Sequence, residues 1–173
     1  MKTLEPNCRK RYRNKLVFIV LILFSSSTYG QLIDMLDNEN GFFGLTFGQD
    51  IKDFPSLKHV RKALWKHEYT NSSDSLRFLQ IKFQQVHYVF YRNRLHSIRI
   101  RVAGDEMSQQ FLALLKEYYG EGEQVGRAPR YYWKGKLVYL VYDQNLLTHN
   151  ADVRFESILI QRELEKDYNA AHE

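Results

Sequence analysis

The clearest periodic segment of the chain spans residues 105–119, where apolar residues recur with the spacing of one helix face. The apolar stripe consists of Met107, Phe111, Leu114, Leu115 and Tyr118. Gly120 follows directly and is suited to end a helix in a left-handed cap. The pattern therefore predicts one long α-helix over about 105–119, with this stripe buried against a sheet.

Strand-like patterns lie on both sides of this helix. Before it, the runs 76–83, 86–91 and 95–102 are bounded by polar residues. Loops this short leave no room for parallel crossovers, so the three runs predict an antiparallel meander. A second meander is expected after the helix, over 131–133, 137–142 and 153–160.

The run 95–102 alternates strictly between apolar and polar residues. Because successive side chains of a strand point to opposite faces, Ile98 and Ile100 should face one way, and Arg99 and Arg101 the other. We therefore expect a sheet with one buried face and one basic, solvated face.

The first part of the domain is less regular. Residues 41–48 predict a strand bounded by glycines, and Asp50 can cap a short helix over about 50–54 that Pro55 stops. The stretch 57–69 fits a helix and a strand equally well.

Strands in runs, with one long and one short helix packed on them, indicate an α+β fold with antiparallel meanders. We expect a secretory signal at 1–30, a polar lead-in at 31–40 and a single α+β domain at 41–162. The charged segment 163–173 is expected to fray as a tail.

The N-terminal segment has the pattern of a signal peptide. Basic residues from Arg9 to Lys15 precede nine apolar residues, Leu16–Phe24, which as a helix span only ~14 Å. Thr28 and Gly30 then occupy the −3 and −1 positions for cleavage before Gln31. This predicts export to the periplasm or the medium, and the alternative is an uncleaved inner-membrane signal anchor with the domain outside the cytoplasm.

Charge and cysteine content exclude several functions for the exported part. The first 30 residues hold six of the 25 basic and one of the 20 acidic residues, so the remainder has 19 of each. A neutral domain argues against nucleic acid as a partner. The only cysteine, Cys8, precedes the apolar run, which excludes disulfides, thiolate catalysis and Cys-ligated zinc from a cleaved chain and argues against a lipoprotein anchor.

No motif of catalysis, phosphate binding or metal binding is present, and we expect no cofactor and no metal. His87 and His96 flank a predicted hairpin turn, but an exposed or hydrogen-bonded histidine is commoner there than a ligand. The main expectation is a non-enzymatic domain. One alternative is a hydrolase in which a carboxylate and His87 or His96 converge only in three dimensions, and another is a purely structural domain.

One interval departs from neutrality. Residues 58–101 contain ten Lys or Arg and only two acidic residues. Six of the cations form a candidate binding face: Arg77, Lys82, Arg92, Arg94, Arg99 and Arg101. Such a face would suit an anionic envelope component or an acidic protein partner, and the alternative is an ordinary solvated sheet face.

Several short stretches carry a resemblance at the level of pattern. Residues 44–50, Gly-Leu-Thr-Phe-Gly-Gln-Asp, resemble the opening of small exported Bacteroidota-like domains of unknown function, as do 88–95, 118–120 and 133–135. The order of helices and meanders is similar to that of the BamE-type outer-membrane assembly lipoproteins and the β-lactamase inhibitor protein. The resemblance implies a non-enzymatic binding module, although this chain has no lipoprotein cysteine.

Overall fold

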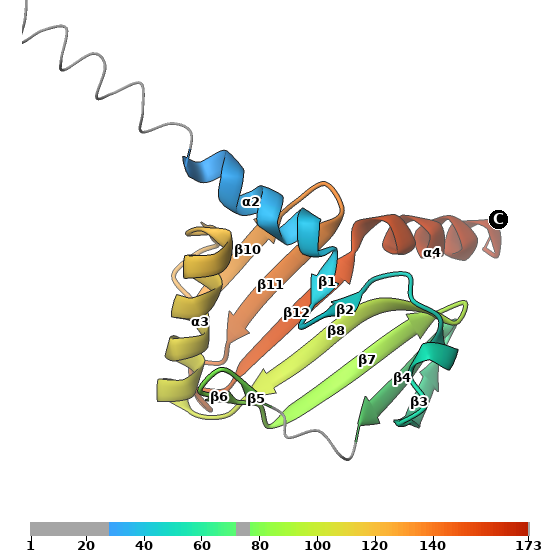
Figure 1. Cartoon of the computed structure of the whole chain (residues 1–173), viewed down its shortest axis with the longest axis horizontal. Coiled ribbons are helices and arrows are strands. Elements are labelled where there is room, and N and C mark those ends of the chain that lie inside the picture. Colours follow the sequence, from blue (N-terminus) through green and yellow to red (C-terminus); the bar gives the residue numbers. More distant parts are fainter. Residues whose placement is uncertain (1–27, 72–76, 173) are drawn as a thin grey trace, which may run out of the picture. The chain divides into compact units, whose positions relative to one another are not determined.

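The structure, a computed structural model, describes residues 28–71 and 77–172. The chain divides into two compact units, Met1–Gln31 and Leu32–Glu173. The elements in Figure 1 are α2 (Thr28–Glu39), β1 (Gly41–Phe42), β2 (Leu45–Thr46), η1 (Ile51–Asp53), β3 (Leu57–Ala63), β4 (Lys66–Asn71), β5 (Arg77–Phe78), β6 (Ile81–Lys82), β7 (Gln85–Tyr91), β8 (Arg94–Val102), α3 (Asp105–Tyr119), β9 (Glu123–Gln124), β10 (Arg130–Lys134), β11 (Val138–Gln144), β12 (Ala151–Ser157) and α4 (Ile158–Ala170).

Within the described residues, eight strands form one sheet in the order β3-β4-β7-β8-β12-β11-β10-β9. All neighbouring pairs in it are antiparallel. The α+β class predicted from the sequence is confirmed. The second predicted meander is present as β10, β11 and β12, but the first is only partly right, because residues 77–82 lie outside this sheet and β4 takes their place beside β7. The two halves join where β8 pairs with β12, which brings Ile98 opposite Phe155.

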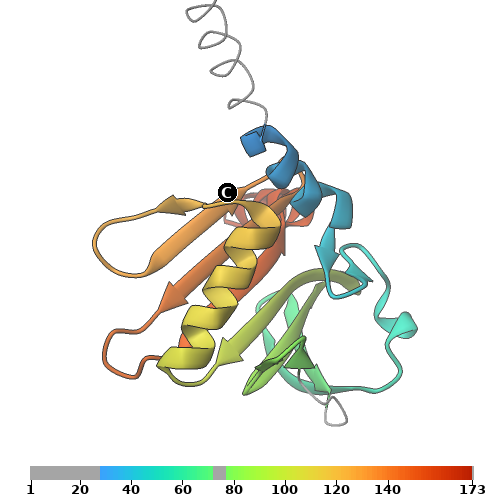
Figure 2. The same ribbon diagram turned by 60° about the vertical axis from the view of Figure 1, so that its left-hand side comes forward.

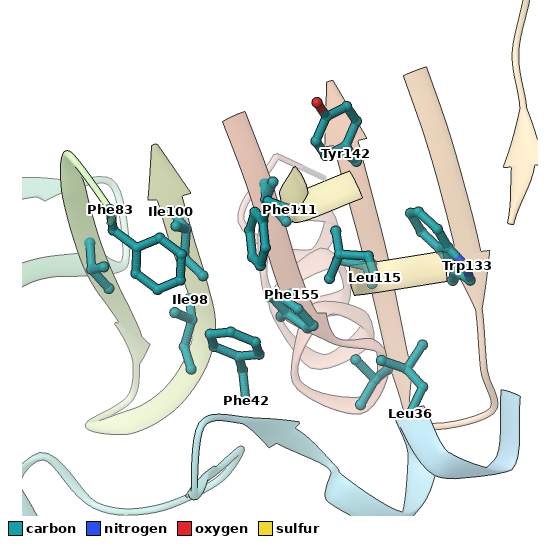
Figure 3. Packing of buried hydrophobic residues seen from close by; sticks show 14 of the residues in the cluster. Leu36, Phe42, Phe83, Ile98, Ile100, Phe111, Leu115, Trp133, Tyr142 and Phe155 are labelled. Carbon is teal, nitrogen blue, oxygen red and sulfur yellow. The ribbon is translucent and has the colours of Figure 1, made fainter. Parts of the chain in front are cut away.

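Helix α3 lies across one face of this sheet (Figure 2). It has the predicted bounds, and Phe111 and Leu115 are buried in one cluster with Ile98, Ile100 and Leu140, as the apolar stripe indicates. Figure 3 shows both helix residues pointing among strand residues such as Phe155. Gly120 ends α3 with a φ of 85°, but its ψ of −178° lies outside the left-handed helical region that we expected.

The segment expected as a polar lead-in forms most of α2. Leu36 is fully buried in the core, and the carboxylate of Asp37 accepts hydrogen bonds from the backbone N–H groups of Lys136, Leu137 and Val138. These bonds fix the turn between β10 and β11. Gly135 makes this approach possible, because a Cβ there would lie 2.2 Å from the Asp37 Oδ1 atom.

The segment 163–173, expected as a frayed tail, is helical as far as Ala170 as part of α4, and residues 158–160, expected as the end of the last strand, form the first turn of this helix. Strand β12 ends at Ser157, whose hydroxyl accepts a hydrogen bond from the Ile160 N–H and caps the new helix. Asp167 and Glu163 then pair with Tyr91 and Arg94 of β7 and β8. Helix α4 therefore packs on the sheet from the side opposite α3 (Figure 2).

The early segments form hairpins. Residues 41–48 hold the β1–β2 hairpin instead of one strand, and 77–82 hold β5–β6. The stretch 57–69, which fits a helix and a strand equally well from the sequence, forms the strand β3 and most of β4, which pair with each other. Asp50 caps the short helix η1, as predicted.

Residues 1–27, which carry the predicted signal core, lie outside the described residues, whereas Thr28, Gly30 and Gln31 fall in the first turn of α2. Among the residues that the structure describes, none of the helices combines the length and the apolar character needed to span a bilayer.

Candidate functional site

Strand alternation gives the sheet two different faces. In β8, Ile98 and Ile100 are buried toward α3, while Arg99 is half-buried and Arg101 exposed on the other side, as the sequence predicts. We call the side that carries Arg99 and Arg101, opposite the side covered by α3, the open face.

The open face contains a hollow of about 630 Å³. Its lining includes the cations Arg61, Arg99, Arg101 and Arg154, the acids Glu68, Asp143 and Asp152, and His87. They come from five strands, β3, β4, β7, β8 and β12, with Asp143 added by β11. The hollow is therefore a surface of mixed charge rather than a purely basic one.

Most arginines of the open face are neutralised by a neighbour. Arg101 binds both carboxylate oxygens of Asp152 across the strands, at 2.8 and 3.0 Å, and this contact raises the pKa of the Arg101 guanidinium. Arg61 pairs with Glu68 through one contact, between its Nε and the Glu68 Oε2 atom.

Arg99 is different. It makes no hydrogen bond or ion pair with any residue that the structure describes, and its direct cross-strand partner is another cation, Arg154. Like charges placed directly opposite one another destabilise a sheet. Arg154 forms an ion pair with Glu156, with 3.5 Å between Nε and Oε2, but its buried Nε makes no hydrogen bond within the described residues.

Polar groups continue from Arg99 toward α4. His96 and Ser97 are 0% exposed, and neither the two ring nitrogens nor the hydroxyl has a hydrogen-bond partner among the described residues. Burial, followed by the charge of Lys66, lowers the pKa of His96 to about 3, and Arg99 and Arg154 act in the same direction. Burial likewise lowers the pKa of the half-buried Lys66. Three cations thus crowd around a neutral histidine.

One acid–base pair does form in the hollow. His87 Nδ1 lies 2.8 Å from Glu68 Oε1, at an angle outside hydrogen-bond geometry. His96 lies apart from it, since His87 pairs across the strands with Arg99. No serine, threonine or cysteine side chain lines the hollow, and no cluster of metal-ligating residues occurs in the described part of the chain. Nothing there positively indicates catalysis.

The six predicted cations do not form one face. Arg77 and Lys82 sit opposite each other on the small β5–β6 hairpin. Arg92 and Arg94, at the β7–β8 turn, pair with Asp167 and Glu163 of α4. Only Arg99 and Arg101 line the hollow.

Sequence reasoning missed Arg61 and Arg154, the other two arginines of the hollow. A signal for Arg154 was present, because it alternates with the apolar Val153 and Phe155 in the predicted last strand. That signal says which face the side chain takes, but not that β12 lies beside β8.

The comparisons with known proteins add no assignment. No family model, no curated protein and no solved structure matches this chain. The case for a function therefore rests on the geometry of the open face.

Proposed function

We propose that this protein is a non-enzymatic binding module that docks an acidic segment of a protein partner on its open face, with a partner carboxylate bound at Arg99. One observation carries the proposal. Arg99 has no counter-charge among the described residues and faces Arg154, whose only acidic neighbour there is Glu156 at 3.5 Å. A carboxylate between the two guanidinium groups would relieve this repulsion and supply charge-assisted hydrogen bonds.

The charge pattern favours a protein over a uniform polyanion. Arg61 and Arg101 already have acidic partners, and carboxylates alternate with cations across the hollow. A surface with both signs is matched by an equally patterned protein surface. Next to it, the rings of Tyr132 and Tyr139 stack at a centroid distance of 5.8 Å, and tyrosine is enriched at protein interfaces.

The proposal includes the setting expected from the sequence. Export with cleavage near Gly30 would place the domain in the periplasm or the medium, where its partner would be an envelope protein. Intact-mass measurement of the exported protein checks this part. A full-length mass in the membrane fraction would instead favour the uncleaved anchor.

The binding test uses two soluble polyanions of different chemistry, poly-L-glutamate for carboxylates and heparin for sulfates. Arg99→Ser should weaken poly-L-glutamate binding by about tenfold, the effect expected for losing a charge-assisted contact of roughly 1.5 kcal/mol. Arg101→Ser is the matched control, since Arg101 is also an arginine, lies two residues further along the same face of β8 and is already paired with Asp152. It should change binding less than twofold.

Three outcomes would overturn the proposal. One is equal loss of binding in both variants, which indicates a general positive field. Another is tight binding of heparin or of phosphatidylglycerol vesicles with none of poly-L-glutamate, which would favour an anionic envelope surface as the ligand. The third is no binding of poly-L-glutamate by the wild-type chain even at low salt, where screening is weakest.

A further inference from the structure

An apolar hollow lies on the side of the molecule that carries α3, separate from the open face. It has a volume of about 510 Å³ and lies between α3 and the hairpins β1–β2 and β5–β6. Its apolar walls include Phe42, Phe43, Phe78, Leu114 and Tyr118. This size is within the range of small-molecule sites in proteins.

Phe43 stands at the rim of this hollow in an unfavourable conformation. It is 61% exposed, has a φ of 58°, and with Gly44 at φ 78° forms the two-residue turn of β1–β2. Turns with two positive φ values prefer Asn or Gly, and a bulky residue there is strained. Leu64 and Leu79 have similar φ values at the turns of β3–β4 and β5–β6, so what distinguishes Phe43 is that its exposed ring borders apolar hollows.

The ring of Phe43 is part of a wider apolar surface. It packs edge-on against Phe78 at a centroid distance of 5.5 Å and lies 6.1 Å from the ring of Phe42. A second hollow, of about 470 Å³, also has Phe42, Phe43 and Leu45 in its lining. Phe43 therefore borders two apolar hollows, which suits an elongated ligand better than a compact one.

The polar groups of the first hollow are mostly occupied. The carboxylate of Glu39 accepts a hydrogen bond from the Tyr119 hydroxyl at 2.7 Å. The Thr46 N–H donates to the Gln49 side chain at 3.0 Å. A peptide backbone bound here would lose water without gaining partners, which is costly, whereas a hydrocarbon chain would not. The second hollow has one acid, Asp53, and one cation, Arg77, so neither sign of head group is selected.

We infer that these hollows bind the hydrocarbon chain of a monomeric amphiphile, such as a long-chain fatty acid, and that the Phe43 ring covers the bound chain. The ligand site is independent of the open face, so either can fail without the other. The hollows would select a ligand by the length and the apolar character of its hydrocarbon chain.

The test measures binding of cis-parinaric acid, a fluorescent fatty acid, to the full-length chain. Phe43→Gly should weaken binding at least tenfold, because the covering ring is lost. Its melting temperature should stay unchanged or rise, since glycine adopts this φ without strain. Leu64→Gly is the matched control: Leu64 is 75% exposed, has a φ of 53° and occupies the corresponding position of the β3–β4 turn. It should bind like wild type, and any binding to the N-terminal apolar segment is common to all variants.

A second variant, Leu114→Gln, puts a polar group into the wall of the first hollow and should also weaken binding at least tenfold. It decides the question if Phe43→Gly fails to fold. Binding by Phe43→Gly equal to that of Leu64→Gly would overturn the inference, and so would unchanged binding by Leu114→Gln. Association with phospholipid vesicles without binding of the monomeric probe would overturn it too, because it would indicate a membrane contact.

Discussion

Two neighbouring residue pairs on β8 and β12 show how differently the two faces of the sheet are built. On the covered face, Ile98 lies opposite Phe155, and both are at most 1% exposed beneath the residues of α3. One position along, on the open face, Arg99 lies opposite Arg154. The first pair adds apolar burial, whereas the second adds repulsion.

The difference shows that the covered face of the sheet is built for stability and that the open face is not. Polar groups on the covered side are satisfied, as in the three hydrogen bonds to Asp37. On the open side, His96, Ser97 and Arg154 keep buried polar atoms that make no hydrogen bond among the described residues, although Arg154 has an ion pair with Glu156. Local arrangements that cost stability are typical of binding sites, and four measurements can break or sharpen the contrast.

The largest effect is expected on the covered face. Phe111→Ala should cost about 3–5 kcal/mol of unfolding free energy, because the fully buried ring leaves a cavity among β8, β11 and β12. Urea denaturation monitored by circular dichroism measures this cost. Glu117→Ala, on the exposed side of the same helix, should cost less than about 0.5 kcal/mol. Similar costs for the two would refute the assignment of the buried helix face.

A second effect should appear on acidification. Burial keeps the pKa of His96 near 3 in the folded state, against about 6.5 when unfolded, so between these values the unfolded chain binds more protons. The contribution of His96 is therefore fully present above pH 6.5 and is lost as the pH falls toward 3. The loss is about 1.4 kcal/mol per pH unit, or roughly 2 kcal/mol at pH 5.

The His96→Leu variant isolates this contribution. Its stability, measured by urea denaturation between pH 7 and 5, should fall less steeply than that of wild type by the stated amount. Lys66, Arg99, Arg154 and Gln161 surround His96 from β4, β8, β12 and α4, and they remain in both proteins. Parallel pH profiles for the two proteins would show that His96 takes up a proton in the folded state.

Asp37→Ala should cost about 1–2 kcal/mol, because three backbone N–H groups at the β10–β11 turn lose their acceptor, two of them at half-buried or buried residues. Although partial burial raises the pKa of Asp37, the same hydrogen bonds keep it below its usual value. Asp34→Ala, one turn earlier on α2 and exposed, is the control and should be neutral. A neutral Asp37→Ala would mean that water replaces the carboxylate at no cost.

The smallest effects, and the most diagnostic for the open face, concern Arg99 and Arg101. Arg101→Ser removes an exposed ion pair and should destabilise by less than about 1 kcal/mol. Arg99→Ser removes the repulsion with Arg154 and should stabilise by a few tenths of a kcal/mol. Thermal melts of both variants against wild type show the signs. Destabilisation by Arg99→Ser would contradict an unpaired Arg99.

The sequence by itself determined the elements whose residues carry a strong local period. Helix α3 and the two faces of β8 follow from spacing alone, because the 3.6-residue and two-residue periods are set by backbone geometry. The glycine-bounded segment 41–48 was harder. Its turn at Phe43 uses a residue type that turn chemistry disfavours, so no local signal marked the hairpin.

Only the tertiary structure decided which residues of one face meet. Arg101 and Asp152 are 51 residues apart, and local patterns carry no information about the pairing of β8 with β12. Helices α2 and α4 were likewise invisible as elements, since their short polar stretches are stabilised by distant partners, Lys136 to Val138 for α2 and β7 and β8 for α4. Short helices depend on such packing more than on their own propensity. For the same reason, a run of cations in the sequence became three separate groups in the fold. Among the described residues, Arg92, Arg94 and Arg101 have acidic partners, whereas Arg99 and the pair Arg77 and Lys82 have none.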